Sequence, residues 1–401
     1  MRHFLVKAGF GLAISTAIVV PAWAVDVQAL SDRLTTAFEQ QGINLKIGSA
    51  REDGNDVTLS NVTAIPKDAE EATEGLTYDS LLLENVSEKA DGSFTIGRVE
   101  LPAKTGETEE GSYSLSPVTA ENLYILSDDR KMLGSTIQAD RMFTESISFS
   151  IESGEFLRIE NIEALGELPQ DGKPATGSVS IGRFSIDTQK MEDDETAKQL
   201  ADAGFSKITG QFTTTGTYDQ SNATATVEDM TLTVDNAAAL KISAAFSNIT
   251  EKLAAQIQEA SQKLDAVDQE ENPQEAMRIA QEEMLPLYSQ IGVDNAMIRI
   301  EDSSLTNKVI DDIAARQSVQ PEQLKLQVAM MAPAILAAYV PAEFAQQIGT
   351  ALQTYLSDPQ SLAIEIAPQG GLTVGDIIAA ATSDPSSLPA LLGATVTANE
   401  D

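Results

Sequence analysis

The spacing of apolar residues changes twice along the chain and divides it into three stretches. At the start, apolar side chains recur every three or four positions, which predicts an amphipathic helix that begins after Asp26 and ends near Gly42. From about residue 43 to 249 the spacing is two, as in strands that bury one face, and residues 146–151 (Ser-Ile-Ser-Phe-Ser-Ile) alternate most clearly. From Thr250 onward helical spacing returns.

The last stretch is predicted to be mainly helical, with two short strands at residues 297–300 and 362–366. The expected helices are 250–267, a segment that resumes after Pro273 and ends near Tyr288, 305–316, 321–339, 341–356 and 373–381. We therefore expect an α+β fold. A twisted antiparallel β-repeat domain over residues 25–249 precedes a mainly helical domain over residues 250–401.

Two segments of the β-rich stretch repeat one eight-residue pattern, 85 residues apart. In each, two alternating apolar residues precede Gly-Arg and two more follow it, one position out of phase. A β-bulge at Gly-Arg would absorb the extra residue and keep all four apolar side chains on one face of the sheet. This candidate apolar face, either structural or ligand-binding, comprises Phe94, Ile96, Val99, Leu101, Val179, Ile181, Phe184 and Ile186.

A second repeated pattern places asparagine among apolar residues, as apolar-x-Asn-apolar, around Asn61, Asn85 and Asn161. Asparagine tolerates the left-handed backbone conformation and bonds locally, so we expect these residues to end strands. A phase jump like that at Gly-Arg also occurs at Glu228-Asp229. These repeats indicate that one β unit is used several times in a long antiparallel sheet.

Residues 328–340 are nearly all apolar and include Pro333. This stretch is too short to span a bilayer, which takes about 20 residues. The pattern favours a helix buried in the core. The alternative is a site that meets a lipid or a partner helix.

The first 24 residues have the three parts of a secretory signal peptide. Arg2 and Lys7 supply positive charge, an apolar run follows, and residues 22–24 (Ala-Trp-Ala) match the small-x-small cleavage pattern. The alternative is an uncleaved membrane anchor, for which the apolar run is short. We expect cleavage after Ala24, no stable membrane span afterwards, and secretion into the periplasm of a Gram-negative bacterium.

Composition removes several classes of function. The chain has 61 acidic and 26 basic residues, a net charge of −35 and no cysteine, and its single histidine and tryptophan are His3 and Trp23 in the predicted signal peptide. Without thiols or imidazoles in the rest of the chain, zinc sites of the usual kind, serine–histidine or cysteine–histidine pairs and disulfides are excluded there. The acidic charge opposes nucleic-acid binding, so we expect no such partner.

Motifs for catalysis or cofactor binding are also missing. The sequence lacks a Gly-x-Ser-x-Gly turn, a Ser-x-x-Lys pair, a phosphate-binding glycine loop and a dinucleotide fingerprint. Its acidic clusters lack the ligand spacing of calcium loops. A pair of carboxylates that hydrolyses a glycosidic bond is the enzymatic alternative. We expect no enzyme, no catalytic residue, no metal and no cofactor.

Several of these patterns resemble known families. The chain resembles uncharacterised secreted proteins of alphaproteobacteria in three features. These are the first helix followed by Leu45-Lys46-Ile47-Gly48, the Leu-x-Asn-Val motifs and the Ile-Gly-Arg units. That resemblance extends to residues 305–309 and 358–362 and implies no known activity. The strand region more loosely resembles the AsmA-like group of periplasmic β-repeat proteins, which implies a role in envelope lipid homeostasis. The helical C-terminal domain departs from that group.

Together these observations favour a non-enzymatic protein of the cell envelope. A sheet with one apolar face must cover that face with helices, another sheet or a ligand. If the helical part covers it only partly, the remaining surface suits a lipid, another apolar ligand or an envelope protein partner. If the face is fully covered, the chain is a structural scaffold or assembly partner without a small-molecule ligand.

Overall fold

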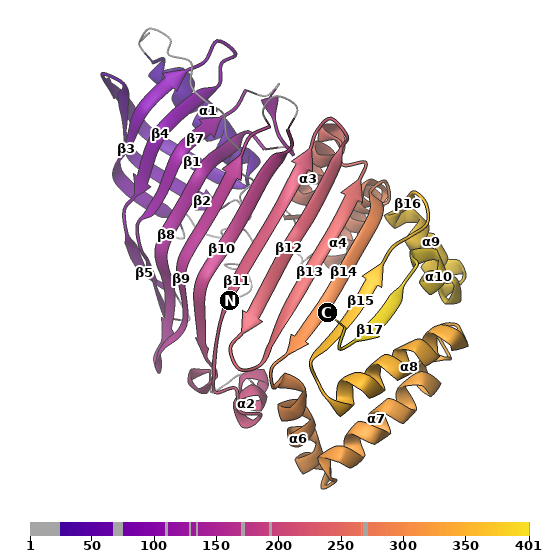
Figure 1. Ribbon diagram of the computed structural model, residues 1–401. Helices are drawn as coiled ribbons and strands as arrows, with labels where there is room; N and C mark the ends of the chain where they lie inside the picture. The colour runs from indigo at the N-terminus through magenta and orange to yellow at the C-terminus, as the bar shows by residue number, and fades with distance from the viewer. Residues whose placement is uncertain are drawn as a thin grey trace.

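The structure is a computed structural model that describes residues 25–66, 75–108, 111–127, 130–133, 135–169, 173–191, 195–265, 267 and 272–400. The predicted signal peptide lies outside these residues. Within them, seventeen strands form one antiparallel sheet, and most of the helices belong to the C-terminal part of the chain (Figure 1). The predicted α+β class is therefore confirmed.

The sheet is a meander in which each long strand pairs with the next one along the chain. Its order is β1 (Ile43–Asp53), β2 (Asp56–Pro66), β3 (Leu76–Glu88), β4 (Phe94–Leu101), β7 (Val118–Ile125), β8 (Ile137–Ile151), β9 (Gly154–Glu167), β10 (Ala175–Asp187), β11 (Lys207–Asp219), β12 (Thr224–Val234), β13 (Ala238–Ser247), β14 (Gly292–Asp302), β15 (Ser361–Ile366) and β17 (Thr395–Ala398). A hairpin of β5 (Lys104–Thr108) and β6 (Gly111–Leu115) adds to the second half of β8. The short β16 (Leu372–Thr373) pairs with the start of β14.

The sheet continues across residue 249, where the sequence pattern places the end of the β-rich domain. Strand β13 pairs with β14 along its whole length, from Ala238 opposite Asp302 to Ser247 opposite Gly292. The two short strands predicted in the C-terminal part are β14 and β15, but β14 has 11 residues. Both ends of β14 contain polar residues, so the apolar pattern indicates only the middle of the strand. Residue 249 therefore marks where the long helical insertions begin, and the sheet does not end there.

The helices were largely predictable in position. The described residues contain α1 (Val27–Gln40), α2 (Glu195–Asp202), α3 (Glu251–Asp265), α4 (Pro273–Arg278), α5 (Leu285–Tyr288), α6 (Leu305–Gln317), α7 (Pro321–Leu336), α8 (Ala342–Ser357), α9 (Val374–Ser383) and α10 (Leu388–Leu392). As predicted, the carboxylate of Asp26 caps α1 by accepting hydrogen bonds from the backbone N–H groups of Gln28 (3.1 Å) and Ala29 (3.0 Å). Gly42 follows the helix with φ +77°.

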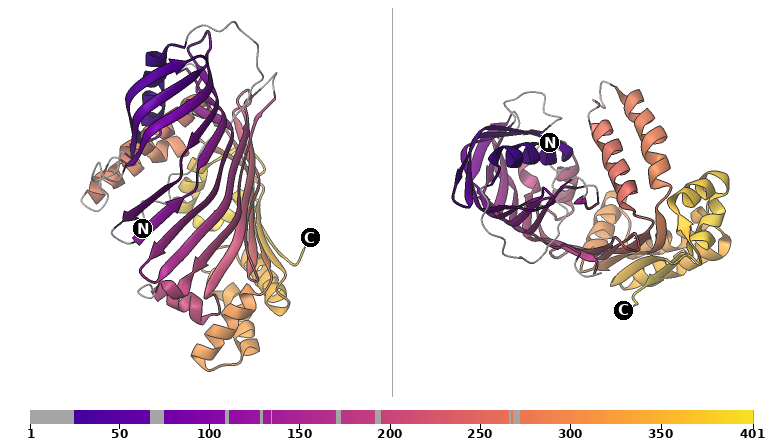
Figure 2. Two further views of the ribbon diagram at one scale, coloured as in Figure 1. Left: turned by 90° about the vertical axis from the view of Figure 1, so that its left-hand side faces the viewer. Right: turned by 90° about the horizontal axis from the view of Figure 1, so that it is seen from above.

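Helices α1 and α3 lie on the same side of the sheet. The N-terminal strands curl around α1 (Figure 2). Side-chain amides of Gln258 and Gln262 in α3 donate hydrogen bonds to the backbone carbonyl of Gln40 at the end of α1, the first at 3.1 Å. These bonds connect segments that are more than 200 residues apart in sequence, so the first helix and the first C-terminal helix hold each other in place.

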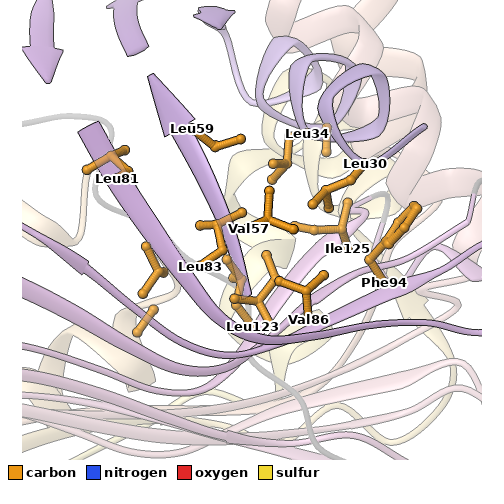
Figure 3. Packing of buried hydrophobic residues seen from close by; sticks show 14 of the residues in the cluster. Leu30, Leu34, Val57, Leu59, Leu81, Leu83, Val86, Phe94, Leu123 and Ile125 are labelled. Carbon is orange, nitrogen blue, oxygen red and sulfur yellow. The ribbon is translucent and has the colours of Figure 1, made fainter. Parts of the chain in front are cut away.

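The main core lies between α1 and the curled strands. Leu30 and Leu34 of α1 lie against Val57 of β2 and Ile125 of β7, together with Phe94 of β4 (Figure 3). Leu30, Val57 and Ile125 have no exposed surface. The helix thus supplies the cover that the apolar face of these strands requires.

The two repeated sequence patterns are the two halves of one structural feature. In three places a glycine lies opposite an asparagine of the neighbouring strand, and each asparagine has left-handed backbone with φ of 51–54°. A Cβ on the glycine would lie 2.9–3.0 Å from the asparagine Cβ, so this approach requires glycine. The pairs are Gly48 with Asn61, Gly97 with Asn85, and Gly182 with Asn161.

The prediction that these asparagines end strands is wrong. Each lies inside a strand, and its left-handed backbone shifts the side-chain alternation by one position, so that Leu59 and Val62, three residues apart, share one core. The partner strand makes the same shift at its glycine, which leaves the register of these pairs unchanged. We call this feature the Gly–Asn pair.

The predicted β-bulge at Gly-Arg is confirmed at only one of the two sites. Between β10 and β11 the register shifts between Ile181 and Phe184, as expected for an extra residue. At Gly97 no register shift occurs on either side, because the neighbouring strands change phase at the same level through Asn85 and Asn122, both of which have left-handed backbone.

Residues 328–340 are not buried in the core, which corrects the prediction made from their apolar sequence. They form most of α7 and the turn after it, and α7 lies on the far side of α8 from the sheet (Figure 1). The two helices approach closely where Pro333 faces Gly349. The larger side chains of this stretch stay outside the contact, and Met330 is 77% exposed.

We predict that Gly97→Ala destabilises the protein by about 1–3 kcal/mol, because the new Cβ would press on the Cβ of Asn85. Adding Asn85→Gly should recover most of this loss, since it removes the opposing Cβ and suits the left-handed backbone. Urea unfolding of the single and double variants measures both effects. Gly370→Ala is the control, because nothing lies within 4 Å of a Cβ there. Equal effects of Gly97→Ala and Gly370→Ala would contradict the proposed role of the pair.

Candidate functional site, an open apolar face

The structure places the two halves of the predicted apolar face in different environments. Phe94, Ile96 and Val99 of β4 lie in the core beneath α1, with only 2%, 0% and 8% of their surfaces exposed. Leu101 packs against the same core. These four side chains are therefore structural, because the protein itself already covers them.

The second half of the predicted face is open. Val179, Ile181, Phe184 and Ile186 in β10 are all half-buried, and none belongs to a buried cluster among the described residues. The bulge after Ile181 keeps the four side chains on one face, as predicted. The ring of Phe184 lies over Gly210 of β11, which has no side chain of its own to occupy that space.

Cross-strand pairing extends this surface from β9 to β15. We call the whole surface the open apolar face, and it includes the four β10 residues. One row of directly opposed residues runs through Ile162, Ile181, Phe212, Leu232, Leu240, Ile300 and Leu362. A second row runs through Met230, Ile242, Ile298 and Ile364.

The open apolar face is a direct continuation of the core beneath α1. Val179 lies opposite Ala164 of β9, which lies opposite Met142 of β8, and Met142 lies opposite Ala120 in the core. Both surfaces therefore belong to the same side of one sheet. Along the two rows this side remains open, whereas nearer one end of the later strands Ala175, Tyr218 and Ala244 of the same side are buried.

Exposure confirms that the two rows of the open apolar face lack such a cover. Leu232, Ile298 and Ile364 are 36%, 48% and 45% exposed, and the other members of the open apolar face are half-buried. The equivalent Ile96 beneath α1 is completely buried. A contiguous apolar surface of this kind marks a place where a ligand, a membrane or another protein binds.

The opposite side of the same strands carries the charged residues. Arg141 donates a hydrogen bond to Glu163 at 2.7 Å, and Lys241 and Arg299 both reach Glu301, at 2.9 and 3.2 Å. The hydrogen bond from Lys241, with Arg299 close by, holds the pKa of Glu301 below its usual range. The two sides therefore differ sharply, because the rows of the open apolar face contain no ionisable side chain.

Two other polar sites among the described residues are a buried tyrosine and a hollow lined by hydroxyl groups. The hydroxyl of Tyr218 donates a hydrogen bond to the backbone carbonyl of Ile249 at 3.0 Å, and burial together with the negative charge of Glu251 raises the pKa of Tyr218. A hollow of about 430 Å³ beside β5, β6 and β8 is lined mainly by hydroxyl groups and has one carboxylate, from Glu107. Glycoside hydrolysis requires two. The described residues contain no cluster of three or more His, Cys, Asp or Glu side chains that could hold a metal.

Sequence reasoning missed most members of the open apolar face. Phe212, Leu232 and Ile298 belong to it although none lies in a Gly-Arg unit. The phase jump at Glu228-Asp229 was the available signal, and the register between β12 and β13 does shift between Val227 and Met230. Strand pairing was needed to show that these residues share one side with Ile181.

Comparison with known proteins adds little about activity. A family model described as "Uncharacterized protein" matches residues 231–399. The matched segment begins in β12 and includes the C-terminal strands and helices, and therefore part of the open apolar face. No curated protein matches the chain. Among the described residues, no helix combines the length and apolar character needed to cross a bilayer.

The two isoleucines at equivalent positions of the Gly-Arg units offer a matched test of coverage. Ile96→Ala should cost about 2–4 kcal/mol of unfolding free energy, because it leaves a cavity beneath α1. Ile181→Ala should cost less than about 1.5 kcal/mol, since the side chain is already half-exposed and leaves no closed cavity. Urea unfolding of both variants measures the difference. Losses of equal size would mean that Ile181 is as well covered as Ile96.

Proposed function

We propose that the protein binds the acyl chains of a lipid on its open apolar face and acts, without enzymatic activity, in the bacterial cell envelope. The observation that carries this proposal is the exposure of Leu232, Ile298 and Ile364 within a face that holds no charge. Covering apolar surface is favourable by about 25 cal/mol per Å². A ligand that covers this face therefore gains binding energy without having to desolvate any charged side chain.

Backbone pairing favours an acyl chain over an extended peptide. The strands β9 to β14 each pair on both edges, so their backbone N–H and C=O groups are already bonded within the sheet. A peptide lying across this face would have to leave its own backbone groups without partners on an apolar surface, which is unfavourable. An acyl chain has no such groups.

The form of the face favours a lipid with more than one chain. A sheet covers only one side of a chain that lies on it, so each methylene gains about half of the 0.8 kcal/mol of complete burial. Association itself costs about 4–15 kcal/mol. Two chains side by side cover each other as well as the face, and they share a single association cost.

Two further expectations belong to this proposal. Cleavage of the signal peptide after Ala24 and release into the periplasm would place the protein between two sources of lipid. The resemblance of the strand region to the AsmA-like group supports a role in lipid homeostasis. The alternative is a scaffold whose open apolar face is covered by one protein partner, and the test below separates the two.

Adjacent residues of β11 provide a matched test. Phe212 lies on the open apolar face, and Thr213 lies on the opposite side and is exposed. Phe212→Asp should weaken binding of a fluorescent two-chain phospholipid about tenfold or more, because a charge in the face must be desolvated. Thr213→Asp adds the same charge and should bind as the unchanged protein does. Melting curves check that both variants fold.

The ligand itself should be recoverable. Lipid mass spectrometry of protein purified from its native envelope is expected to find co-purified two-chain lipids, and Phe212→Asp should lose them. Recovery of one stoichiometric protein in place of lipid would support the scaffold. If neither lipid nor probe binds, the proposed function is wrong.

The proposed cleavage site gives a separate prediction. The backbone nitrogen of Val25 donates to Glu52 Oε1 at 3.1 Å, and Val25 is buried. Cleavage after Ala24 would turn this nitrogen into an ammonium group paired with that carboxylate. Intact mass and N-terminal sequencing of the periplasmic protein should find Val25 first. A chain that keeps Met1 in the membrane fraction would contradict this expectation.

A further inference from the structure

Helix α7 presents an apolar surface that the fold does not use. Leu326, Met330, Met331, Ile335 and Tyr339, on α7 and the turn after it, are exposed by 61%, 77%, 49%, 56% and 69%. Helix α7 lies beyond the sheet, at the end of the molecule where α6, α7 and α8 gather (Figure 1). We call these five side chains the α7 surface.

The α7 surface is held in place from behind. Leu324 at the start of α7 is buried in a small cluster with Ile310 and Ala314 of α6. The ammonium of Lys325 donates a hydrogen bond to Asn307 Oδ1 at 3.0 Å. These contacts, with the close approach of α7 to α8, fix the helix on its neighbours. The exposed side of α7 is therefore held in a fixed orientation.

We propose that the α7 surface docks on a lipid bilayer of zwitterionic lipids, with α7 lying in the plane of the interface. The helix has 16 residues and contains Pro333, whereas spanning takes about 20. A helix of this length with Leu, Met and Ile side chains can bury them at the boundary between headgroups and acyl chains. Tyr339, at the end of the stretch, is a residue type that favours this boundary.

Charge selects this occupant over the alternatives. Residues 326–342 contain no charged side chain, whereas 22% of the whole chain is charged. The nearest cation, Lys325, has Glu322 within 3.5 Å, so the helix offers no free positive charge to anionic lipid. Anionic lipids and a second copy of this chain, whose net charge is −35, would both be repelled. A zwitterionic surface is not subject to this repulsion.

This proposal does not depend on acyl-chain binding by the open apolar face. The two surfaces use different residues, and either can fail in experiment without the other. If both hold, the α7 surface would bring the protein to the membrane that supplies the lipid.

A tryptophan placed on the α7 surface tests the proposal locally. Trp23 is the only tryptophan of the chain, so full-length protein with Trp23→Phe and Tyr339→Trp carries one reporter, on α7. With phosphatidylcholine vesicles, its emission should move to shorter wavelength and be quenched by lipids brominated on their acyl chains. Because the signal arises at residue 339, binding through residues 1–24 does not produce it.

Charge variants provide the control. In the reporter background, Met330→Glu with Ile335→Glu should weaken vesicle binding about tenfold or more, since the new carboxylates oppose insertion. Gln346→Glu with Thr350→Glu adds the same charge on exposed positions of α8 and should change binding less than twofold. Raising the salt concentration should have little effect on binding to phosphatidylcholine.

Three results would overturn the proposal. The first is an emission spectrum that vesicles do not change. The second is equal weakening by the α7 and α8 charge variants. The third is a blue shift without vesicles that grows with protein concentration, together with a larger sedimenting species that Met330→Glu with Ile335→Glu abolishes. That last outcome would assign the α7 surface to contact between two copies of the chain.

Discussion

All long strands that the structure describes belong to one sheet, and apolar side chains are concentrated on one side of it. This side must be separated from water, and no second sheet is present among the described residues to do so. Helix α1 covers the first strands, where Leu30, Val57 and Ile125 are completely buried. Among the described residues, no equivalent cover lies over the two rows from β9 to β15, where Ile298 and Ile364 remain exposed. The proposed binding function follows from this difference in coverage within a single continuous face.

The Gly–Asn pairs are what keeps the face continuous. A strand of 11–15 residues alternates sides strictly, so one extra residue would send the rest of its apolar side chains to the polar side. Asn85 and Gly97 make the shift together in paired strands, and Asn161 and Gly182 do the same. Two strands that change phase at one level keep both their register and their common face. Charges such as Glu160 and Glu163, which flank Asn161, therefore stay on the other side.

Much of the fold could be predicted from the sequence, and the site only in part. Periodicity identified α1, the long β-rich stretch and most helices, because these depend on local spacing. The roles of Asn85 and Gly97 could not be predicted from the sequence, since they depend on the pairing of these two residues across neighbouring strands. It was equally impossible to predict which part of the apolar side of the sheet a helix covers. Ile96 and Ile181 are both followed by Gly-Arg in the same apolar pattern, and only the position of α1 makes the first structural and the second available. The exposure of Met330 could not be predicted for the same reason, because the sequence of an apolar helix is similar whether the helix is buried or exposed.

The most direct test of the open apolar face is solvent access to isoleucine methyl groups, measured by NMR on methyl-labelled protein with a water-soluble paramagnetic agent. The methyl signals of Ile181, Ile242 and Ile298 are expected to broaden strongly, while those of Ile96 and Ile125 stay sharp. A two-chain lipid should then protect the first group and leave the second unchanged. Equal protection of all five residues before any lipid is added would contradict the account, because it would mean that the face is already covered.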